Sequence, residues 1–299
     1  MSLDPPDRHG YRHTPRSPFG GRSAARTRTT TRSGEAHLRL YWEVARATAR
    51  RMTTYRAATA AGVFTNTIFG FVLSYVLLAV VRDRPIDGFD ATDAVTFTFV
   101  TQGMLMVVGI FGNEEIAERV RTGDIALDLC RPYDYQGWWA AAAYGRASFY
   151  AWARGVPPFL AGALVFDLRV PAAAGTWVAF VVAVTLAIGV AFAWGFLLQL
   201  AAFWIIDVRG PSQLGWVAAQ FLAGTFVPLA LFPAGLEGVA RALPFAAMNQ
   251  LPVEVFLGDR TGGGLLAVYA HQLSWLAALV ALGRLVLARA VRKVVIQGG

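Results

Sequence analysis

Few side chains in this chain of 299 residues have a type and spacing that could support catalysis or metal binding. The single cysteine, Cys130, can form neither an internal disulfide nor a cysteine-based zinc site. The four histidines do not pair as metal ligands on one predicted helix. Asp207, Glu254 and Asp259 lack the neighbouring motif that a hydrolase would need. We therefore predict no metal site and no catalytic residue, and a membrane-embedded enzyme is a weak alternative.

The only lysine, Lys293, follows Arg292 and precedes Val294. A phosphate-binding P-loop needs a lysine that follows glycine and precedes serine or threonine, so this chain cannot contain one. If a nucleotide drives the protein, another chain binds it. We therefore expect that the chain is not an enzyme by itself and carries no cofactor.

Charged residues are concentrated in a segment from residue 113 to about residue 138. This segment cannot lie in lipid, because so many charges are too costly to bury there. Glutamates precede arginines at spacings that allow ion pairs within one helix. These residues are Glu114, Glu115, Glu118, Arg119 and Arg121. The sequence predicts that this helix continues the apolar run before it.

A second, short helix is predicted after Gly123, which can end the first helix in a left-handed conformation. Asp124 can cap the new helix, and Pro132 ends it. The short helix carries the apolar side chains Ile125, Leu127 and Leu129. Two interpretations stay open at this point. The leucines either pack under a helix bundle as part of an ordinary loop, or they form a protrusion that docks into a partner protein.

The composition places these segments in a membrane protein. Hydrophobic residues make up 56% of the chain and charged residues 15%, with a mean hydropathy of +0.46, whereas about a quarter of an average soluble domain is charged. Several apolar runs reach the roughly 20 residues that cross a bilayer, which excludes a wholly soluble protein. The predicted fold is an all-α polytopic membrane protein with six transmembrane helices, the third interrupted by Arg154 and by the pair Pro157 and Pro158. The six cover residues 57–81, 94–112, part of 141–166, 174–205, 214–232 and 265–287.

Basic residues predict the orientation of these spans. The formal net charge is +8, and 12 of the 27 Lys and Arg residues lie between Arg8 and Arg56, before the first apolar run. Most of the others lie in a few short loops and at the C-terminus, and such a segregation is typical of a membrane protein whose cytoplasmic segments retain Lys and Arg. We predict a multi-pass protein of the inner (plasma) membrane with both termini in the cytoplasm, in contact with lipid and with no nucleic-acid partner.

The N-terminal region divides into two parts. Residues 1–36 are predicted to form a disordered, basic cytoplasmic tail, because they hold too few large apolar side chains to build a core. An organelle transit peptide is the alternative for this part. Residues 37–56 are predicted to form an amphipathic helix in the membrane interface, with a helix packed on a soluble partner as the alternative. Trp42, Ala45, Ala49 and Met52 recur on one face of this helix, and Arg39, Glu43, Arg46 and Arg50 lie on another.

Two short helices are predicted between the last two spans, on the outer side, at about residues 232–259. Apolar residues recur at helical spacing up to Pro244, which ends the first helix, and a second apolar stretch leads to Gly258. The spaced residues are Leu236, Val239, Ala240 and Leu243. Short apolar helices beside a bilayer indicate shallow or re-entrant segments. A seventh span is the alternative, and Pro244 and Pro252 disfavour it.

Four of these features together resemble a known family. They are the amphipathic helix before the first span, the local pattern RTGDIALDLCRP, the tripeptide LPF followed by P-x-x-x-x-x-G, and the terminal RKVVIQGG. From Leu38 to Gly299 the chain resembles the type-2 permease subunits of ATP-binding-cassette exporters. Within them it is similar to the bacterial branch called ABC-2 family transporter permeases, which work with a separate ATPase. The first 36 residues lie outside this resemblance.

The resemblance implies that residues 113–138 contain a coupling helix that binds in a groove of the ATPase. It places the contact at Glu118, Arg121, Gly123, Asp124, Leu127, Leu129, Arg131 and Pro132. It also implies two copies of the ATPase, which bind ATP and Mg, and a second permease, identical or homologous, across the substrate pathway. The interfacial helix, with Arg39, Trp42, Arg46 and Arg50, would approach the ATPase. The sequence does not identify the substrate, and export follows from the resemblance alone.

A stand-alone secondary transporter driven by an ion gradient is the main alternative. Such transporters place ionisable residues deep in their spans, and Arg154 and His271 are the candidates here. Arg154 could equally reach the interface or pair with a carboxylate. His271, beside Gln272, is more typical of a hydrogen bond between packed helices than of a proton relay. Because these two residues are isolated and no internal repeat is evident, an ATPase-driven transporter is favoured.

Overall fold

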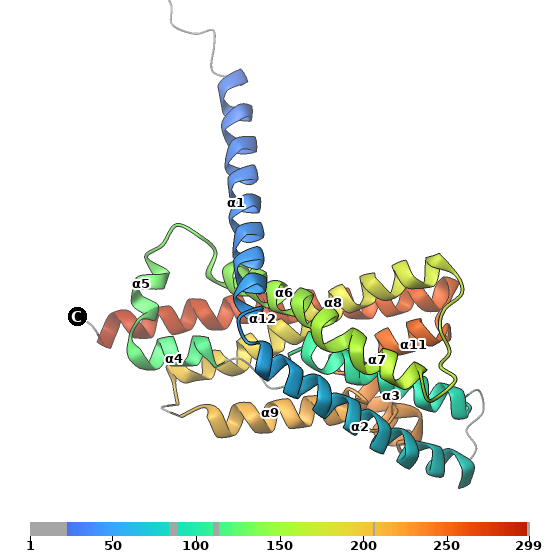
Figure 1. Cartoon of the computed structure of the whole chain (residues 1–299). Coiled ribbons are helices and arrows are strands. Elements are labelled where there is room, and N and C mark those ends of the chain that lie inside the picture. Colours follow the sequence, from blue (N-terminus) through green and yellow to red (C-terminus); the bar gives the residue numbers. More distant parts are fainter. Residues whose placement is uncertain (1–22, 84–88, 110–113, 206, 298–299) are drawn as a thin grey trace, which may run out of the picture. The chain divides into compact units, whose positions relative to one another are not determined.

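Helices form the regular structure of this protein (Figure 1). The computed structural model describes residues 23–83, 89–109, 114–205 and 207–297. No extended strand occurs within these ranges, so the predicted all-α fold is confirmed. Residues Tyr41–Gly299 form one compact unit and Met1–Leu40 form a second.

Helix α1 (Ser23–Met52) begins and ends earlier than the helix predicted over residues 37–56. The helix thus extends into the segment 1–36 that is predicted to be a disordered tail, and residues 1–22 of that segment lie outside the described residues. Alanine and arginine are strong helix formers, and no proline interrupts this stretch. The helix ends in a turn, where the amide of Thr53 donates to the carbonyl of Arg50.

Three helices in the described part of the chain are long and apolar enough to cross a membrane. They are α2 (Arg56–Asp83), α8 (Ala174–Leu200) and α12 (Gly262–Gln297), and they coincide with the first, fourth and sixth predicted spans. Helices α8 and α12 pack along one another (Figure 1). The buried amide of Gln272 on α12 donates to the carbonyl of Ala183 on α8, at 2.9 Å.

The second predicted span is shorter than expected. Helix α3 (Ala91–Val107) has 17 residues, and most of them are buried against α2, α7 and α11. It ends because Gly109 has a φ of +74°, a left-handed conformation that glycine adopts readily. Helix α4 (Glu115–Thr122) is a separate element. The prediction that the charged helix continues the second span is therefore wrong.

The third predicted span is interrupted where the sequence indicates. It consists of helix α6 (Tyr135–Tyr150), the π-helical turn η1 (Ala151–Gly155) and helix α7 (Val156–Ala163). The π-helical turn contains Arg154 and ends two residues before Pro157, and neither Pro157 nor Pro158 can donate a backbone hydrogen bond. The π-helical turn also lies close to α3, because Gly155 and Gly103 of α3 have no side chains and their backbones come into contact.

The fifth predicted span, residues 214–232, is not one helix. Helix α9 (Arg209–Leu222) ends before Gly224, whose φ is +71°, and the one-turn helix η3 (Leu229–Leu231) follows. The predicted pair of short helices is present as α10 (Ala234–Ala242) and α11 (Gln250–Leu257), separated by a turn that contains Pro244. Every residue of α11 is buried, and the helix packs between α8 and α3.

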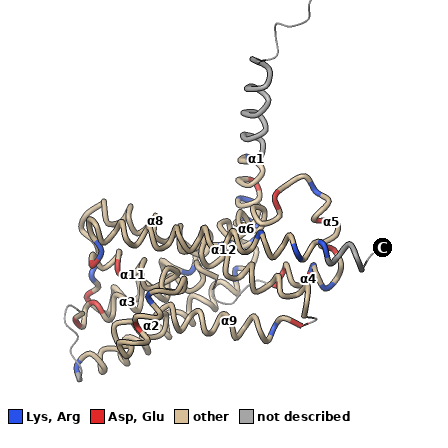
Figure 2. The backbone as a smooth tube through the Cα atoms, turned by 180° about the vertical axis from the view of Figure 1, so that it is seen from behind, with Lys and Arg blue, Asp and Glu red and all other residues tan. Residues whose placement is uncertain are grey.

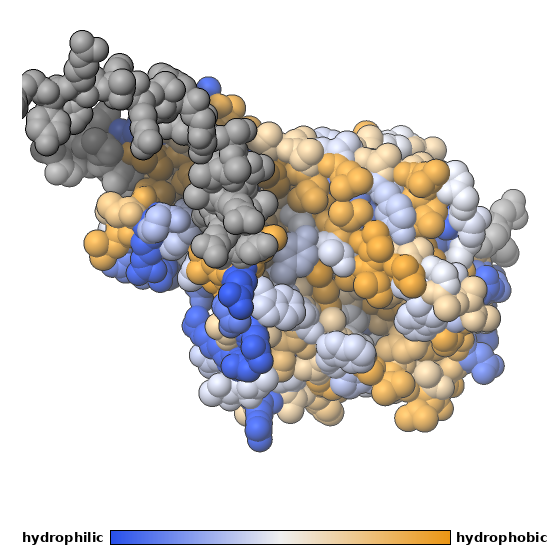
Figure 3. Space-filling model, turned by 90° about the horizontal axis from the view of Figure 1, so that it is seen from above, coloured by the Kyte–Doolittle hydropathy of each residue, from blue (hydrophilic) through white to orange (hydrophobic). Residues whose placement is uncertain are grey.

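Polar and apolar surfaces are distributed as a membrane protein requires. Most charged residues of Tyr41–Gly299 lie towards the two ends of the helix bundle, with few between them (Figure 2). Broad apolar areas cover the side shown in Figure 3. Large apolar side chains are exposed on the three long helices, among them Phe64 on α2, Val178 on α8 and Leu266 on α12.

Candidate functional site

The charged segment forms two short helices at one end of the bundle, α4 and α5 (Ile125–Leu129) (Figure 1). Gly123 separates them with a φ of +83°, as predicted. Asp124 precedes α5, but its carboxylate accepts from the hydroxyl of Thr122 at 2.9 Å and does not cap the helix. One predicted ion pair within α4 is present, since Arg121 Nη2 lies 2.6 Å from Glu118 Oε2.

Buried side chains anchor this segment to the bundle. Ile116 and Ile125 are each 2% exposed and pack against Tyr135 and Trp139 of α6. Arg119 Nη1 donates to Asp128 Oδ2 at 2.7 Å, and the Asp128 side chain is only 6% exposed. The sequence did not indicate this ion pair, because nine residues and a helix break separate its members.

The sequence left open whether the apolar side chains of α5 pack under the bundle or form a protrusion that docks into a partner, and the structure contains side chains of both kinds. Ile125 is buried and Leu129 packs partly against the anchoring cluster. Leu127 is 69% exposed. The other residues predicted to contact the ATPase are exposed, so Leu129 is the member of the set that faces inward. These exposed residues are Glu118, Arg121, Gly123, Asp124, Arg131 and Pro132.

Lateral contacts join α4 to four other helices. The amide of Ile116 donates to Gln199 Oε1 of α8 at 3.0 Å. Glu115 lies 3.6 Å from Arg51 of α1 and 3.9 Å from Arg146 of α6, measured between charged atoms. Glu114 Oε2 lies 3.3 Å from Nε of Arg209, the first residue of α9. The segment is therefore held from the side, by polar contacts to neighbouring helices.

The four residues predicted for the interfacial helix are all exposed: Arg39, Trp42, Arg46 and Arg50. Val44, on the same helix, is buried, and the backbone of Ala45 approaches Gly145 of α6. The packed face of α1 beyond Tyr41 is thus centred on Val44 and Ala45. Trp42, which the sequence placed with the apolar residues, lies outside this face.

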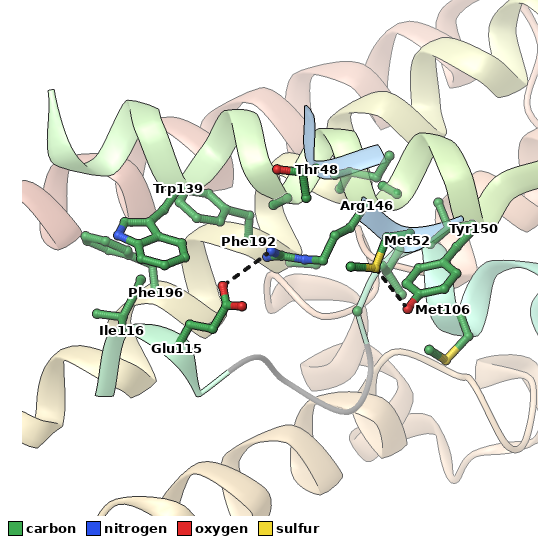
Figure 4. Close-up of a pocket in the computed structure, with 18 of the residues that line it drawn as sticks. Thr48, Met52, Met106, Glu115, Ile116, Trp139, Arg146, Tyr150, Phe192 and Phe196 are labelled. Atoms are coloured by element: carbon green, nitrogen blue, oxygen red, sulfur yellow. Dashed lines mark hydrogen bonds and ion pairs between the residues drawn. The ribbon is translucent and has the colours of Figure 1, made fainter. Parts of the chain in front are cut away.

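A cavity of about 310 Å³ lies beside the start of α4 (Figure 4). Helices α1, α3, α4, α6, α8 and α9 contribute to its walls, which are mainly apolar and aromatic. Arg146 of α6 places its guanidinium in the cavity next to Glu115 (Figure 4). Arg146 is not among the residues predicted from the sequence, although an arginine inside an apolar run is a signal of a functional site.

At the opposite end of the bundle, Glu254 of α11 is the centre of a second charged cluster. Its side chain is 7% exposed and lies 2.7 Å from Nη1 of Arg241 and 2.8 Å from Nε of Arg260. Gln250 donates to the same carboxylate at 3.0 Å. Sequence reasoning found no partner for Glu254, because its partners lie 13 and 6 residues away along a chain with two turns.

The loop after α11 carries a carboxyl group with a raised pKa. Burial is the main cause of the raised pKa of Asp259, and the nearby carboxylates of Asp93 and Glu254 add to it. Arg169 and Arg260 partly offset this effect. The described residues contain no group of three or more His, Cys, Asp or Glu side chains that could hold a metal ion.

The two isolated polar residues considered for ion coupling both contact backbone carbonyl groups. Arg154 Nη2 donates to the carbonyl of Ala58 at 3.0 Å, and its guanidinium lies 5.5 Å from the ring centre of Tyr150. His271 Nε2 lies 3.3 Å from the carbonyl oxygen of Leu243. Both side chains therefore join neighbouring helices.

Comparison with known proteins bears on this arrangement. Residues 64–298 match the model of a family described as ABC-2 family transporter protein. No curated protein and no solved structure matches the chain. The family match covers most of the chain, including α4, α5 and α8 to α11, and it confirms the resemblance that the sequence indicates. The chain therefore belongs to the ABC-2 family of transporter proteins and is a multi-pass membrane permease that associates with an ATPase subunit of the ATP-binding-cassette type.

Proposed function

We propose that this permease forms the substrate pathway of an exporter and that α4 and α5 dock into its ATPase. In this proposal two copies of the ATPase bind ATP and Mg, and the chain itself has no catalytic site. A second permease, identical or homologous, faces it across the pathway. The exposed Leu127 is the observation that carries the docking proposal, because it sits on a segment that is otherwise anchored by buried residues.

The energetics favour a partner at Leu127. Burying a leucine side chain contributes about 1.5–3 kcal/mol relative to leaving it in water. Because Ile116, Ile125 and the Arg119–Asp128 pair already fix α4 and α5, little further ordering is needed when a partner binds. The surrounding charged residues, such as Asp124 and Arg131, form a polar rim around this apolar centre.

We further propose six membrane crossings, with both termini and α4–α5 in the cytoplasm of a bacterial cell. The long helices α2, α8 and α12 supply three crossings, and α3, α6 with α7, and α9 supply the others. Helix α9 alone has 14 residues, about 21 Å, so its crossing includes the irregular residues that follow it. Helices α10 and α11 then lie on the outer side, as shallow or re-entrant elements.

Replacing Leu127 with Asp is expected to reduce transport and substrate-stimulated ATP hydrolysis at least tenfold, because the charge would have to be desolvated in the ATPase groove. Membrane insertion and thermal stability are expected to stay unchanged, since the side chain is exposed. The measurement compares ATP hydrolysis and transport by the reconstituted complex. L127M, which keeps the apolar contact, is the matched control. Substrate-stimulated ATP hydrolysis at the wild-type rate in L127D would disprove docking at this residue.

The orientation can be tested at Cys130, because it is exposed beside Leu127 and is the only cysteine in the chain. A membrane-impermeant maleimide is expected to label it in inside-out vesicles and not in intact cells. Binding of the ATPase is expected to slow the labelling at least severalfold. Labelling in intact cells would place α5 on the outer side and contradict the proposed topology. A C130S variant gives the background.

The contacts of Arg154 and His271 weigh against the alternative of an ion-driven secondary transporter. An ion-coupling residue needs access to water and a change of partner during the cycle. Arg154 instead donates a hydrogen bond to a backbone carbonyl of α2. His271 contacts the backbone carbonyl of Leu243, directly after α10. Transport by the permease alone, in liposomes with an ion gradient and no ATP, would favour this alternative.

A further inference from the structure

The cavity beside α4 contains the guanidinium of Arg146, which lies near the carboxylate of Glu115 but too far from it for a hydrogen bond. Arg146 Nη1 lies 3.9 Å from Glu115 Oε2, which permits ionic attraction but exceeds the length of a hydrogen bond. The Arg146 side chain is 23% exposed, and it lines the cavity. A guanidinium in an apolar setting is costly unless several of its N–H groups are paired. Because none of the described residues accepts a hydrogen bond from Arg146, its N–H groups are available to an anion in this cavity.

Apolar groups flank this guanidinium on both sides. Trp139 and Phe196 lie on one side of it, and Met52 and Met106 lie on the other (Figure 4). Water could solvate Arg146, but it would also have to wet these apolar walls. A ligand that joins an anionic group to an apolar body satisfies both parts of the site. The volume of about 310 Å³ is at the lower end of the usual range for ligand pockets, about 300–1,000 Å³, which favours a compact molecule with one tail.

The carboxylate that competes for Arg146 belongs to the proposed ATPase-docking segment. Glu115 is the first residue of α4, and it lies near Arg146 and near Arg51 of α1. An anion bound to Arg146 would weaken the attraction that holds Glu115 towards α6. The next residue, Ile116, is buried in the cluster that anchors α5. Occupation of the cavity and the position of α4 are thus linked through one arginine.

We propose that this cavity binds a compact amphiphilic anion at Arg146, in competition with Glu115, and that binding changes the mobility of α4 and α5. The anion is either a transported compound or a single-chain lipid, since both present the same chemistry. The proposed effect on α4 and α5 rests on the proposed docking of these helices to the ATPase. Binding of the anion to the cavity does not rest on it. Trp139 and Trp216 line the cavity and provide a direct optical signal.

The test uses the full chain in nanodiscs of zwitterionic lipid, without ATPase. Probes are 10-bromodecanoate, the neutral 10-bromodecanol and acetate, because bromine quenches tryptophan fluorescence on contact. We expect saturable quenching by bromodecanoate, at least tenfold weaker apparent binding of bromodecanol, and no competition by acetate. Equal binding of the acid and the alcohol would overturn the proposal. Loss of quenching in a W139F,W216F variant is expected, and quenching that persists there would place the ligand elsewhere.

Two substitutions with opposite expected effects separate binding from misfolding. R146Q is expected to weaken binding of bromodecanoate at least tenfold, because a charge-assisted hydrogen bond is lost, and to leave binding of bromodecanol unchanged. E115Q is expected to strengthen binding of bromodecanoate severalfold, because the competing carboxylate is neutralised. A misfolded variant cannot bind more tightly. Arg284 is exposed and is not among the residues that line the cavity, so R284Q is the matched control. Unchanged affinity in both R146Q and E115Q would overturn the proposal.

The link to α5 has its own readout in the maleimide labelling rate of Cys130. Bromodecanoate is expected to change this rate in the wild-type protein and not in R146Q. If the anion binds and the labelling rate stays constant, the proposed effect on α4 and α5 is wrong. If no anion binds while L127D still abolishes ATPase coupling, this inference fails and the proposed function stands.

Discussion

Replacing Glu254 with Gln is expected to lower the free energy of unfolding by about 3 kcal/mol, because it removes the charge that two arginines share. Glu254 is 7% exposed and holds Arg241 and Arg260 at hydrogen-bond distance. Without the carboxylate, Arg260 would lose this partner, and among the described residues Arg241 would keep only its ion pair with Glu237. The arginine side chains are 30% and 38% exposed, so water relieves part of the penalty. The expected loss of stability therefore lies at the lower end of the roughly 3–5 kcal/mol that breaking a buried pair costs.

The measurement is unfolding of the purified protein in a denaturing detergent series, followed by tryptophan fluorescence. E118Q is the matched control, because Glu118 forms an exposed pair with Arg121, with side chains 49% and 55% exposed. Exposed pairs contribute about 0–1 kcal/mol, so E118Q is expected to unfold close to the wild type. Equal losses in E254Q and E118Q would show that burial of Glu254 does not matter.

Replacing Gly145 with Ala is expected to destabilise the protein by about 2 kcal/mol, the balance of two effects. Alanine favours a helix over glycine by about 1 kcal/mol. The added methyl group would overlap the backbone carbonyl of Ala45, whose Cα would lie 2.8 Å away. The backbone cannot relieve this overlap by a change of rotamer, as a side chain can. Helix α1 must therefore move away from α6. Overpacking of this kind costs about 3 kcal/mol at the upper end of its usual range.

Gly238 provides the matched control for this prediction. It lies within α10, and a methyl group there would meet nothing within 4 Å. G238A is therefore expected to gain up to about 1 kcal/mol from helix propensity alone. Thermal unfolding in nanodiscs compares the two variants. A G145A protein as stable as G238A would show that α1 and α6 can separate without loss of stability.

Local signals in the sequence predict the parts of the fold that depend on local conformation. Gly123 ends α4 in a left-handed conformation, and the interruption near Arg154 coincides with a π-helical turn. Helix α10 ends just before Pro244, as expected, and α11 follows after a turn. In each case the cause is a property of the residue itself, namely the freedom of glycine or the missing donor of proline.

The sequence does not predict features that depend on contacts between distant elements. Hydropathy indicates that residues 94–112 and 214–232 are removed from water. It does not indicate whether lipid or protein surrounds them. Helix α3 is buried by its neighbours and stops at Val107, and α9 stops at Leu222 before a left-handed glycine. The charged pairs of Asp128 and Glu254 cross helix breaks, so no periodic spacing reveals them. Leu127 and Leu129 looked alike in sequence, and only the packing of α5 separates them.

The end of α3 before Gly109 determines how a force applied to α5 would be transmitted to the other helices. A continuous rod would carry the load along the axis of α3, but α3 ends at Val107 and α4 is a separate element. A force applied at Leu127 would instead be transmitted through the lateral contacts of α4. These are the hydrogen bond to Gln199 of α8 and the ion pairs of Glu115 with α1 and α6. Helix α8 packs along α12 over much of its length. Under the proposed docking, a movement of α5 would therefore reach the α8–α12 pair directly, without passing along α3.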